Sequence, residues 1–190
     1  MARYLANRRM TDGQNFTLHY RMVQLASGEA LNAALRAQYQ ALKAANHTAI
    51  TYSHHFEGRY ENTYIPASVL TSIQPMLAVA RREAARFLRR DRLPEVGFWL
   101  NEMAPGHVTL AHRHDEDDEL LSGVYYIDVP ENSGDLVLEQ GCAETRIHPQ
   151  SGMLVLFPPD VLHHVTQNLA AETRLSVGMN FGVRDMESVC

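Results

Sequence analysis

Cysteine is scarce in this chain, and long apolar runs are missing. Only Cys142 and Cys190 occur among its 190 residues, so we expect two free thiols and a reducing, cytoplasmic compartment rather than a disulfide framework. No segment approaches the roughly 20 apolar residues that span a bilayer. The arginines near the N-terminus are not followed by the apolar core of a signal peptide. We therefore expect neither a membrane segment nor a secretory leader.

Positive charge is also in short supply. The formal net charge is −5, which argues against a broad nucleic-acid-binding surface, and no nucleic-acid partner is expected. Arginines gather only in residues 81–92, and we interpret them as the solvated side of a helix or as contacts to an anionic partner. The cluster consists of Arg81, Arg82, Arg86, Arg89, Arg90 and Arg92.

Three common catalytic signatures are absent from the sequence: the Walker loop, the dinucleotide fingerprint and the nucleophile elbow. Phosphoryl transfer, nicotinamide chemistry and serine hydrolysis therefore have no support. Hydrophobic residues make up 45% and charged residues 21% of the chain. This is a globular composition, and we expect one domain over residues 1–190.

The hydrophobic period changes near residue 95. Residues 1–94 are expected to form a helical or mixed N-terminal buttress. One amphipathic helix is predicted from the cap Ser27 to Asn46, and a second from Pro75 to just before Pro94. The apolar positions of the first are Leu31, Leu35, Tyr39 and Leu42, and those of the second are Met76, Ala80, Ala84, Phe87 and Leu88. Residues 48–66 lie between them and are expected to form short strands or loops.

The back part, residues 95–182, contains eight short β-type runs separated by turn residues. Such regular spacing predicts an antiparallel sandwich or small barrel, with the two helices covering one outer sheet face. The fold class is therefore mainly β with flanking helices. The eight runs cover residues 96–103, 107–112, 121–129, 135–139, 144–147, 153–157, 163–167 and 174–181.

Histidines form the strongest chemical pattern. His112 and His114 alternate on a predicted strand and can point to the same side, together with Glu116. A third metal ligand must come from a distant segment, and His163 follows an apolar strand and a turn. The alternative is that surface histidines cluster by chance. We interpret the remaining candidates as ordinary surface histidines: His19, His47, His54, His55, His107 and His148.

A second pattern is suited to binding an anion. Arg174 and Ser176 lie on one face of a predicted strand. There a guanidinium fork and a hydroxyl can bind a carboxylate. A structural salt bridge from Arg174 to an acidic side chain is the alternative interpretation.

From Trp99 to Asn180 the chain resembles the 2-oxoglutarate/Fe(II) oxygenase superfamily, with a distant similarity to prolyl hydroxylases. The resemblance implies a double-stranded β-helix, that is, a cupin-like jelly roll. It rests on an ordered series of motifs. These are Trp99-Leu100-Asn101, Gly106, His112-Arg113-His114, Leu121-Ser122-Gly123-Val124-Tyr125-Tyr126, Pro130 with Ser133-Gly134-Asp135-Leu136, Leu154-Val155-Leu156-Phe157-Pro158, His163-His164-Val165, Arg174-Leu175-Ser176 and Asn180-Phe181.

The resemblance implies that His112, His114 and His163 bind the metal. The superfamily commonly has His-x-Asp or His-x-Glu where this chain has His-x-His, and the segment after His114 is acidic. A carboxylate can therefore replace one histidine. The competing set is His114, Glu116 and His163.

The cosubstrate-binding residues follow from the same resemblance. Arg174 would hold the distal carboxylate of 2-oxoglutarate, Tyr126 would donate its phenol to it, and Ser176 would support it. Asn101 completes this set, and it also belongs to the expected pocket wall. The other expected wall residues are Trp99, Val124 and Asn180.

The activity implied by the resemblance is an oxygenase reaction that uses Fe(II), 2-oxoglutarate and O₂. It would hydroxylate an unactivated C–H bond and release succinate and CO₂. The substrate stays open among a small molecule, a peptide and a protein, and a homodimer stays open as well. One rival is a cupin-like metal or small-molecule binding protein, which has no need of Arg174 and Ser176. Another is a cupin-type isomerase or a dioxygenase without cosubstrate.

Overall fold

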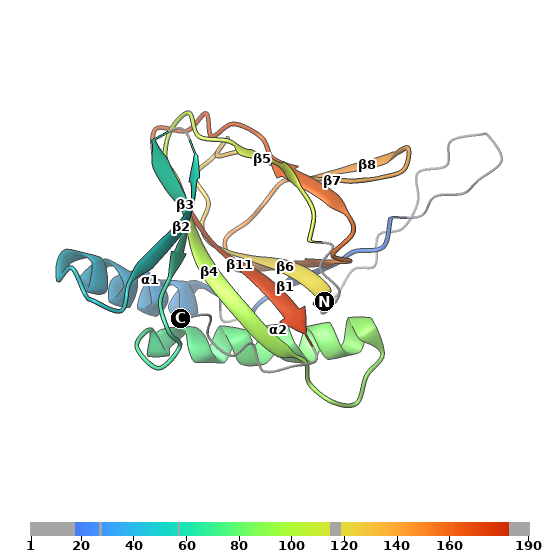
Figure 1. Ribbon diagram of the computed structural model, residues 1–190, viewed down its shortest axis with the longest axis horizontal. Helices are drawn as coiled ribbons and strands as arrows, with labels where there is room; N and C mark the ends of the chain where they lie inside the picture. The colour runs from blue at the N-terminus through green and yellow to red at the C-terminus, as the bar shows by residue number, and fades with distance from the viewer. Residues whose placement is uncertain (1–17, 27, 57, 115–118, 183–190) are drawn as a thin grey trace.

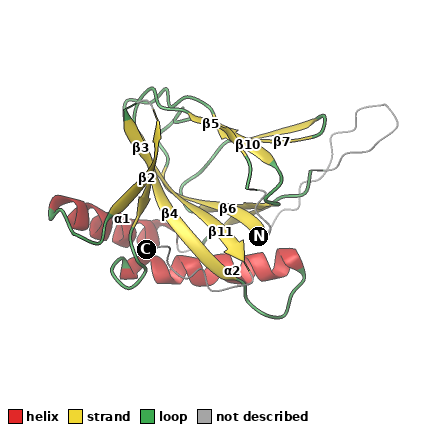
Figure 2. Cartoon of the chain, viewed as in Figure 1, coloured by secondary structure: helices red, strands yellow, loops and turns green. Residues whose placement is uncertain are grey.

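The computed structural model describes residues 18–26, 28–56, 58–114 and 119–182, and these form two antiparallel sheets flanked by two α-helices (Figures 1 and 2). The front part contains β1 (Arg21–Gln24), α1 (Gly28–Ala44), β2 (Thr51–Phe56), β3 (Arg59–Tyr64), the 3₁₀ turn η1 (Thr71–Ile73) and α2 (Gln74–Leu88). The back part contains β4 (Glu95–Met103), β5 (Thr109–His112), β6 (Glu119–Asp128), β7 (Leu136–Gln140), β8 (Ala143–Ile147), β9 (Met153–Phe157), β10 (Leu162–Val165) and β11 (Arg174–Gly182).

Strands of the back part alternate between the two sheets. β4, β6, β9 and β11 belong to the larger sheet, whose order is β1-β9-β6-β11-β4-β3-β2, and β5, β7, β8 and β10 form the smaller sheet in the order β5-β10-β7-β8. A chain that crosses repeatedly between two facing antiparallel sheets makes a jelly roll. This order is that of a double-stranded β-helix, and the eight predicted runs all became strands. The predicted fold class is confirmed.

The helices cover the outer face of the larger sheet (Figure 1). Leu35 and Tyr39 of α1 and Met76 and Ala80 of α2 are buried in one core with apolar side chains of β4, β6, β9 and β11. A smaller core fills part of the space between the two sheets. Both amphipathic patterns therefore predicted the buried faces correctly. No helix of the described ranges is long and apolar enough to cross a membrane.

The first helix ends as its sequence predicts. Asn46 has a left-handed φ of 47°, and the neighbouring His47 N–H donates to the Leu42 carbonyl at 3.1 Å. Asparagine adopts this conformation more readily than most residues, so it ends a helix well. Ser27, the expected cap, lies outside the described residues.

Strands from the front part extend both edges of the larger sheet. β1 pairs with β9, while the β2–β3 hairpin joins the opposite edge through β4. The hairpin falls within residues 48–66, where strands or loops were expected. Strand β1 was not predicted, because Arg21–Gln24 is only four residues long and has no alternation of apolar and polar positions.

A buried ion pair fixes strand β1 to helix α2. The Arg21 guanidinium lies 2.6 Å from a Glu83 carboxylate oxygen, and both side chains are at most 10% exposed. Arg86 of the next helical turn also contacts Glu83, but its own side chain is 66% exposed. Removing one partner of a buried pair leaves a charge in a poorly solvated place.

We therefore expect Glu83→Ala to lower the free energy of unfolding by about 3 kcal/mol, because the Arg21 guanidinium loses this carboxylate. Urea denaturation of the variant checks the value. Arg86→Ala is the matched control and is expected to cost less than about 1 kcal/mol, since its contact is solvated. Equal losses in the two variants would contradict this account of the pair.

Candidate active site

A cavity of about 540 Å³ is lined by strands of both sheets. Its lining includes residues that the sequence singled out for chemistry and others that it did not. The former are Trp99, Asn101, His112, His114, Val124, Tyr126, His163, Arg174, Ser176 and Asn180, and the latter include His54, Glu61, Asn62 and Tyr64. The fold thus gathers the candidate residues, which are spread over most of the back part, around one space.

Three histidines come together at this cavity. Strand β5 pairs antiparallel with β10, and this pairing places His112 opposite His163. His114 follows β5, and its backbone N–H donates to the Pro159 carbonyl at 2.9 Å. One ring nitrogen from each histidine lies within 4.8 Å of the others. Such a group can hold one metal ion.

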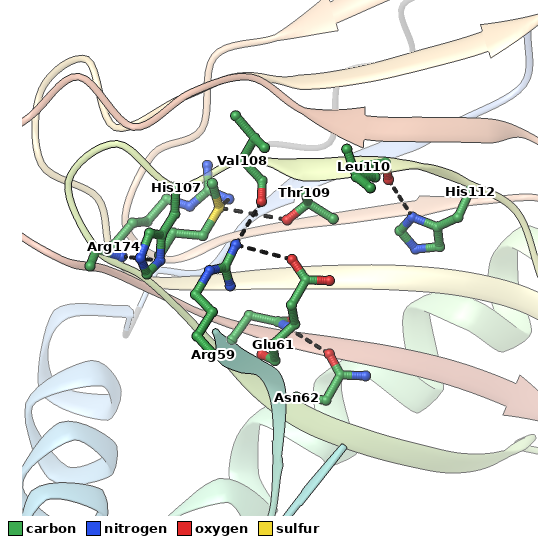
Figure 3. Close-up of polar contacts among 12 residues, drawn as sticks. Arg59, Glu61, Asn62, His107, Val108, Thr109, Leu110, His112 and Arg174 are labelled. Carbon is green, nitrogen blue, oxygen red and sulfur yellow. Dashed lines mark hydrogen bonds and ion pairs between the residues drawn. The ribbon is translucent and has the colours of Figure 1, made fainter. Parts of the chain in front are cut away.

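Hydrogen bonds orient two of the three rings. The Nδ1 atom of His112 lies 2.8 Å from the Leu110 carbonyl oxygen (Figure 3), and Nδ1 of His163 lies 3.0 Å from the Val161 carbonyl oxygen. A carbonyl oxygen can only accept, so Nδ1 carries the proton and the lone pair lies on Nε2. This is how metal-binding histidines are usually held. The tautomers of both rings suit a ligand role.

The third ring has polar neighbours of a different kind. Nδ1 of His114 lies 3.7 Å from a Glu119 carboxylate oxygen and 3.4 Å from the Asn180 side-chain nitrogen. The Asn180 amide also donates to Glu119 at 2.5 Å. Metal-binding histidines commonly have a carboxylate near the ring nitrogen that does not bind the metal.

The central histidine is uncharged at neutral pH. The pKa of His163 is lowered to about 3, mainly by burial and in addition by the neighbouring imidazoles of His112 and His114. A neutral ring keeps the lone pair that a metal needs. His164, the next residue, points elsewhere, since its Nδ1 lies 3.2 Å from a Glu139 carboxylate oxygen.

The competing metal-binding set of His114, Glu116 and His163 is not tested by the structure, because Glu116 lies outside the described residues. His114 and His163 belong to both sets, and the structure places them together with His112. The choice between His112 and Glu116 stays a prediction.

Arg174 lies at the cavity as a buried cation, and no carboxylate of the described residues pairs with it. Its side chain donates to the carbonyl oxygens of Ser133 and Gly134 at 3.2 and 2.9 Å and contacts the Met103 sulfur at 2.7 Å. The residue is 2% exposed, and its Nε has no hydrogen-bond partner among the described residues. Within those residues it forms no ion pair with a carboxylate, so the salt-bridge interpretation is wrong there.

Tyr126 lies beside this cation. The guanidinium carbon of Arg174 is 5.7 Å from the centre of the Tyr126 ring. Its hydroxyl is buried and has no partner in the described part of the chain. Burial raises the pKa of Tyr126 to about 12, although the Arg174 charge opposes the shift. The phenol therefore keeps its proton at neutral pH and can donate it to an acceptor.

Two buried donors without partners, the Tyr126 hydroxyl and Arg174 Nε, suit an anionic group that enters the cavity. Ser176 is buried and pairs in register with Tyr126 on one side and with Asn101 on the other. A carboxylate would satisfy the donors and balance the charge. These residues therefore fit the distal carboxylate of 2-oxoglutarate.

The amide of Asn101 is already engaged on its donor side. It donates to the Glu61 carbonyl oxygen and to the Asn62 side-chain oxygen, both at 2.9 Å. Asn101 therefore anchors strand β3. No sequence pattern indicates that the β2–β3 hairpin reaches the cavity, because its mixed aromatic and polar residues follow no recognisable motif.

Trp99 forms part of the wall because a glycine makes room for it. Gly178 lies opposite Trp99 in the β4–β11 register, and a methyl group on Gly178 would come within 2.4 Å of the indole. The Trp99 ring lies 6.1 Å from that of His114 and 6.3 Å from that of Tyr64. It is also the only tryptophan of the chain, so its fluorescence reports on the cavity.

Solved structures share this architecture. A prolyl-4-hydroxylase from Pseudomonas putida superposes with a TM-score of 0.59 at 18% identity, covering 88% of this chain and 89% of that one. The fold is that of the 2-oxoglutarate-dependent oxygenases. A prolyl hydroxylase from Trichoplax adhaerens, solved with a peptide fragment of the hypoxia inducible factor oxygen degradation domain, gives 0.65 at 14% identity over 86% and 83% of the two chains.

A further solved structure with this fold is that of a carbocyclase. The non-heme alpha ketoglutarate dependent carbocyclase SnoK from nogalamycin biosynthesis superposes with a TM-score of 0.64 at 14% identity, over 87% of this chain and 79% of that one. No protein-family model and no curated protein sequence matches the chain. At these identities the likeness establishes the oxygenase fold, and the reaction has to be argued from the site.

The geometry predicts that His163→Ala weakens Fe(II) binding by more than about 100-fold. Loss of a residue that only hydrogen-bonds to a ligand weakens metal binding by about 10- to 100-fold, and loss of the ligand itself must weaken it more. Anaerobic titration of Fe(II) into the purified chain measures the affinity. His164→Ala is the adjacent control and should bind iron like the parent. Equal retention by both variants would show that His163 is not a ligand.

Glu116→Ala separates the two candidate sets in the same titration. The three-histidine set predicts unchanged binding of Fe(II), whereas loss of iron would move the site to the carboxylate set of His114, Glu116 and His163.

Proposed function

We propose that this protein is an Fe(II)- and 2-oxoglutarate-dependent oxygenase that hydroxylates an unactivated C–H bond. One observation carries the proposal: Arg174 and Tyr126 present buried donors without a carboxylate partner in the described residues, in the same cavity as three clustered histidines. The double-stranded β-helix fold of solved oxygenases supports it.

His112, His114 and His163 would hold iron(II). Three protein ligands leave positions open for other groups, as in non-heme iron sites. When bound, iron and 2-oxoglutarate together supply the oxidising power, and they consume O₂ and release succinate and CO₂. The protein residues bind and orient these groups.

Arg174 would bind the distal carboxylate of 2-oxoglutarate. Its contacts to the Ser133 and Gly134 carbonyls hold the guanidinium in place, while its Nε stays available. Tyr126 would donate its hydroxyl to the same carboxylate, and Ser176 would support it. Because the cavity shields these groups from water, each charged contact is stronger than it would be in solvent.

The rival binding protein without 2-oxoglutarate does not account for these donors. Three histidines alone suit a cupin-like metal site or a dioxygenase without cosubstrate equally well. Neither has a use for a buried arginine that lacks an acidic partner. Keeping such a cation in a cavity is costly unless an anion joins it.

The substrate class is proposed from related structures, and the compartment from the cysteine content. Structures of this fold include a hydroxylase solved with a peptide and a carbocyclase of a biosynthetic route, so a peptide or a small molecule fits the proposal. The rarity of cysteine and the exposed thiol of Cys142 support a reducing cytoplasm.

The proposal is tested by following succinate. Purified chain with Fe(II), 2-oxoglutarate and air should form succinate slowly even without its substrate. Arg174→Ala should bind 2-oxoglutarate at least about 10-fold more weakly, because a charge-assisted bond to the carboxylate is lost. Arg146→Ala removes an exposed guanidinium and is the matched control. Failure of the parent to bind 2-oxoglutarate, or equal binding by Arg174→Ala, would contradict the proposal.

A further inference from the structure

The β2–β3 hairpin contributes a polar group of its own to the cavity. His54, Glu61, Asn62 and Tyr64 of this hairpin line the same space as the histidine cluster. None of them has a role in the iron or 2-oxoglutarate sites proposed above. They lie on the part of the cavity wall that is left for a substrate.

The hairpin is fixed at two places. Arg59 donates to the Val108 carbonyl at 2.8 Å and to Glu61 at 3.1 Å, which links β3 to the segment that leads into β5 (Figure 3). On the other side, the Asn101 side chain of β4 donates to the Glu61 carbonyl oxygen and to the Asn62 side-chain oxygen. These contacts tie strand β3 both to β4 and to the segment that leads into β5.

The hydrogen bonds that link Asn101, Asn62 and His54 can be assigned a single donor-to-acceptor direction. The Glu61 carbonyl can only accept, so the atom of Asn101 that faces it is the amide nitrogen. This same nitrogen also lies 2.9 Å from Asn62, so the Asn62 atom facing it is the side-chain oxygen. The Asn62 nitrogen is then left to face His54 Nδ1 at 3.0 Å.

This direction fixes the tautomer of His54. An amide nitrogen only donates, so Nδ1 of His54 must accept, and the Ser53 hydroxyl 2.6 Å away can donate to the same atom. The neutral ring therefore carries its proton on Nε2. This is the opposite tautomer to that of His112 and His163, whose Nδ1 atoms face carbonyl oxygens. His54 is thus arranged to donate a hydrogen bond, not to bind a metal.

The backbone of His54 is also unusual. Its φ is 57°, a left-handed conformation in the middle of strand β2. It interrupts the usual alternation of side chains, since Tyr52 and His55, three residues apart, both contact the ring of Tyr60. Residues other than glycine rarely adopt this backbone conformation, and those that do concentrate at functional sites.

We propose that His54 binds the substrate by donating its Nε2–H to an acyl oxygen, either a carboxylate or an amide carbonyl. This inference rests on the oxygenase proposal and names the class of its substrate: an acid or amide whose apolar body packs against Trp99 and Tyr64. The Trp99 ring lies 6.1 Å from the ring of His114, and the Tyr64 ring lies 6.3 Å from that of Trp99. The Asn62 amide also donates to the Tyr64 hydroxyl at 3.3 Å.

Charges around the cavity favour an acyl oxygen over an ammonium group. Glu61 is compensated by Arg59, and the cation Arg113 lines the cavity as well. The other carboxylate of the described lining is that of Glu119. It lies 3.7 Å from Nδ1 of His114 and accepts a hydrogen bond from Asn180. No carboxylate of the described lining is directed at His54 by a hydrogen bond or ion pair.

Trp99 fluorescence tests the proposal with three probes of similar shape. Benzoate and benzamide carry an acyl oxygen, whereas benzylamine does not. The full-length chain is titrated with each probe, both alone and after saturation with Zn(II) and 2-oxoglutarate, which occupy the other sites without turnover because zinc has no redox chemistry. His54→Leu should weaken both acyl probes by about fivefold to tenfold, the range expected for one hydrogen bond, and leave benzylamine within about twofold.

Matched variants isolate the donor. His54→Gln supplies another N–H and should recover part of the acyl affinity. Asn62→Asp keeps an oxygen toward Asn101 but turns a second oxygen toward His54, so the proton should move to Nδ1 and the acyl preference should be lost. ¹⁵N NMR of the His54 ring measures this change of tautomer directly. His55→Leu, on the same strand and facing Tyr60, should behave like the parent.

The outcomes separate the two proposals. Acyl-selective loss in His54→Leu with an Nε2-protonated ring in the parent supports the inference. Equal weakening of all three probes, unchanged binding, or a parent ring protonated on Nδ1 would overturn it. The oxygenase proposal fails in a different readout, when neither zinc nor 2-oxoglutarate binds. The titration of benzamide, which carries no negative charge for Arg174 to bind, still reports on His54 without them.

Discussion

The pairing of β5 with β10 is the constraint on which the site depends. It places His112 opposite His163 and leaves His114 at the end of the strand, at the cavity between the two sheets. The double-stranded β-helix makes this pairing, because the chain returns to the smaller sheet after β9. Backbone carbonyls then hold Nδ1 of His112 and His163, so that strand geometry sets both ring position and tautomer.

The second constraint on the cavity is the buried charge of Arg174, which lines it together with the three histidines. Arg174 is a buried cation, and burial lowers its pKa from the usual range even though Tyr126 and Asp135 oppose the shift. A fold that served only its own stability would pair such a charge or replace it with an apolar side chain. Here the guanidinium contacts neutral carbonyls and the Met103 sulfur. The free-energy cost of burying the Arg174 charge is consistent with a site that binds a carboxylate.

The sequence predicted the parts of the molecule that have a period or a motif. Short β-type runs separated by turn residues predicted all eight strands of the back part, and the spacing of Leu35 and Tyr39 predicted the buried face of α1. The places of His54 and Asn62 in the site could not be predicted from the sequence. They depend on a left-handed backbone conformation and on hydrogen bonds that run through Asn101. Such features depend on tertiary contacts that no local pattern encodes.

Metal and cosubstrate are expected to share one cavity, so their binding should be coupled. Anaerobic calorimetric titration of 2-oxoglutarate, with and without Fe(II), measures this coupling most directly. Since the histidine cluster and Arg174 would hold opposite ends of the bound pair, Fe(II) should tighten the binding of 2-oxoglutarate by about tenfold or more. The same affinity in both titrations, or no binding in either, would contradict the account.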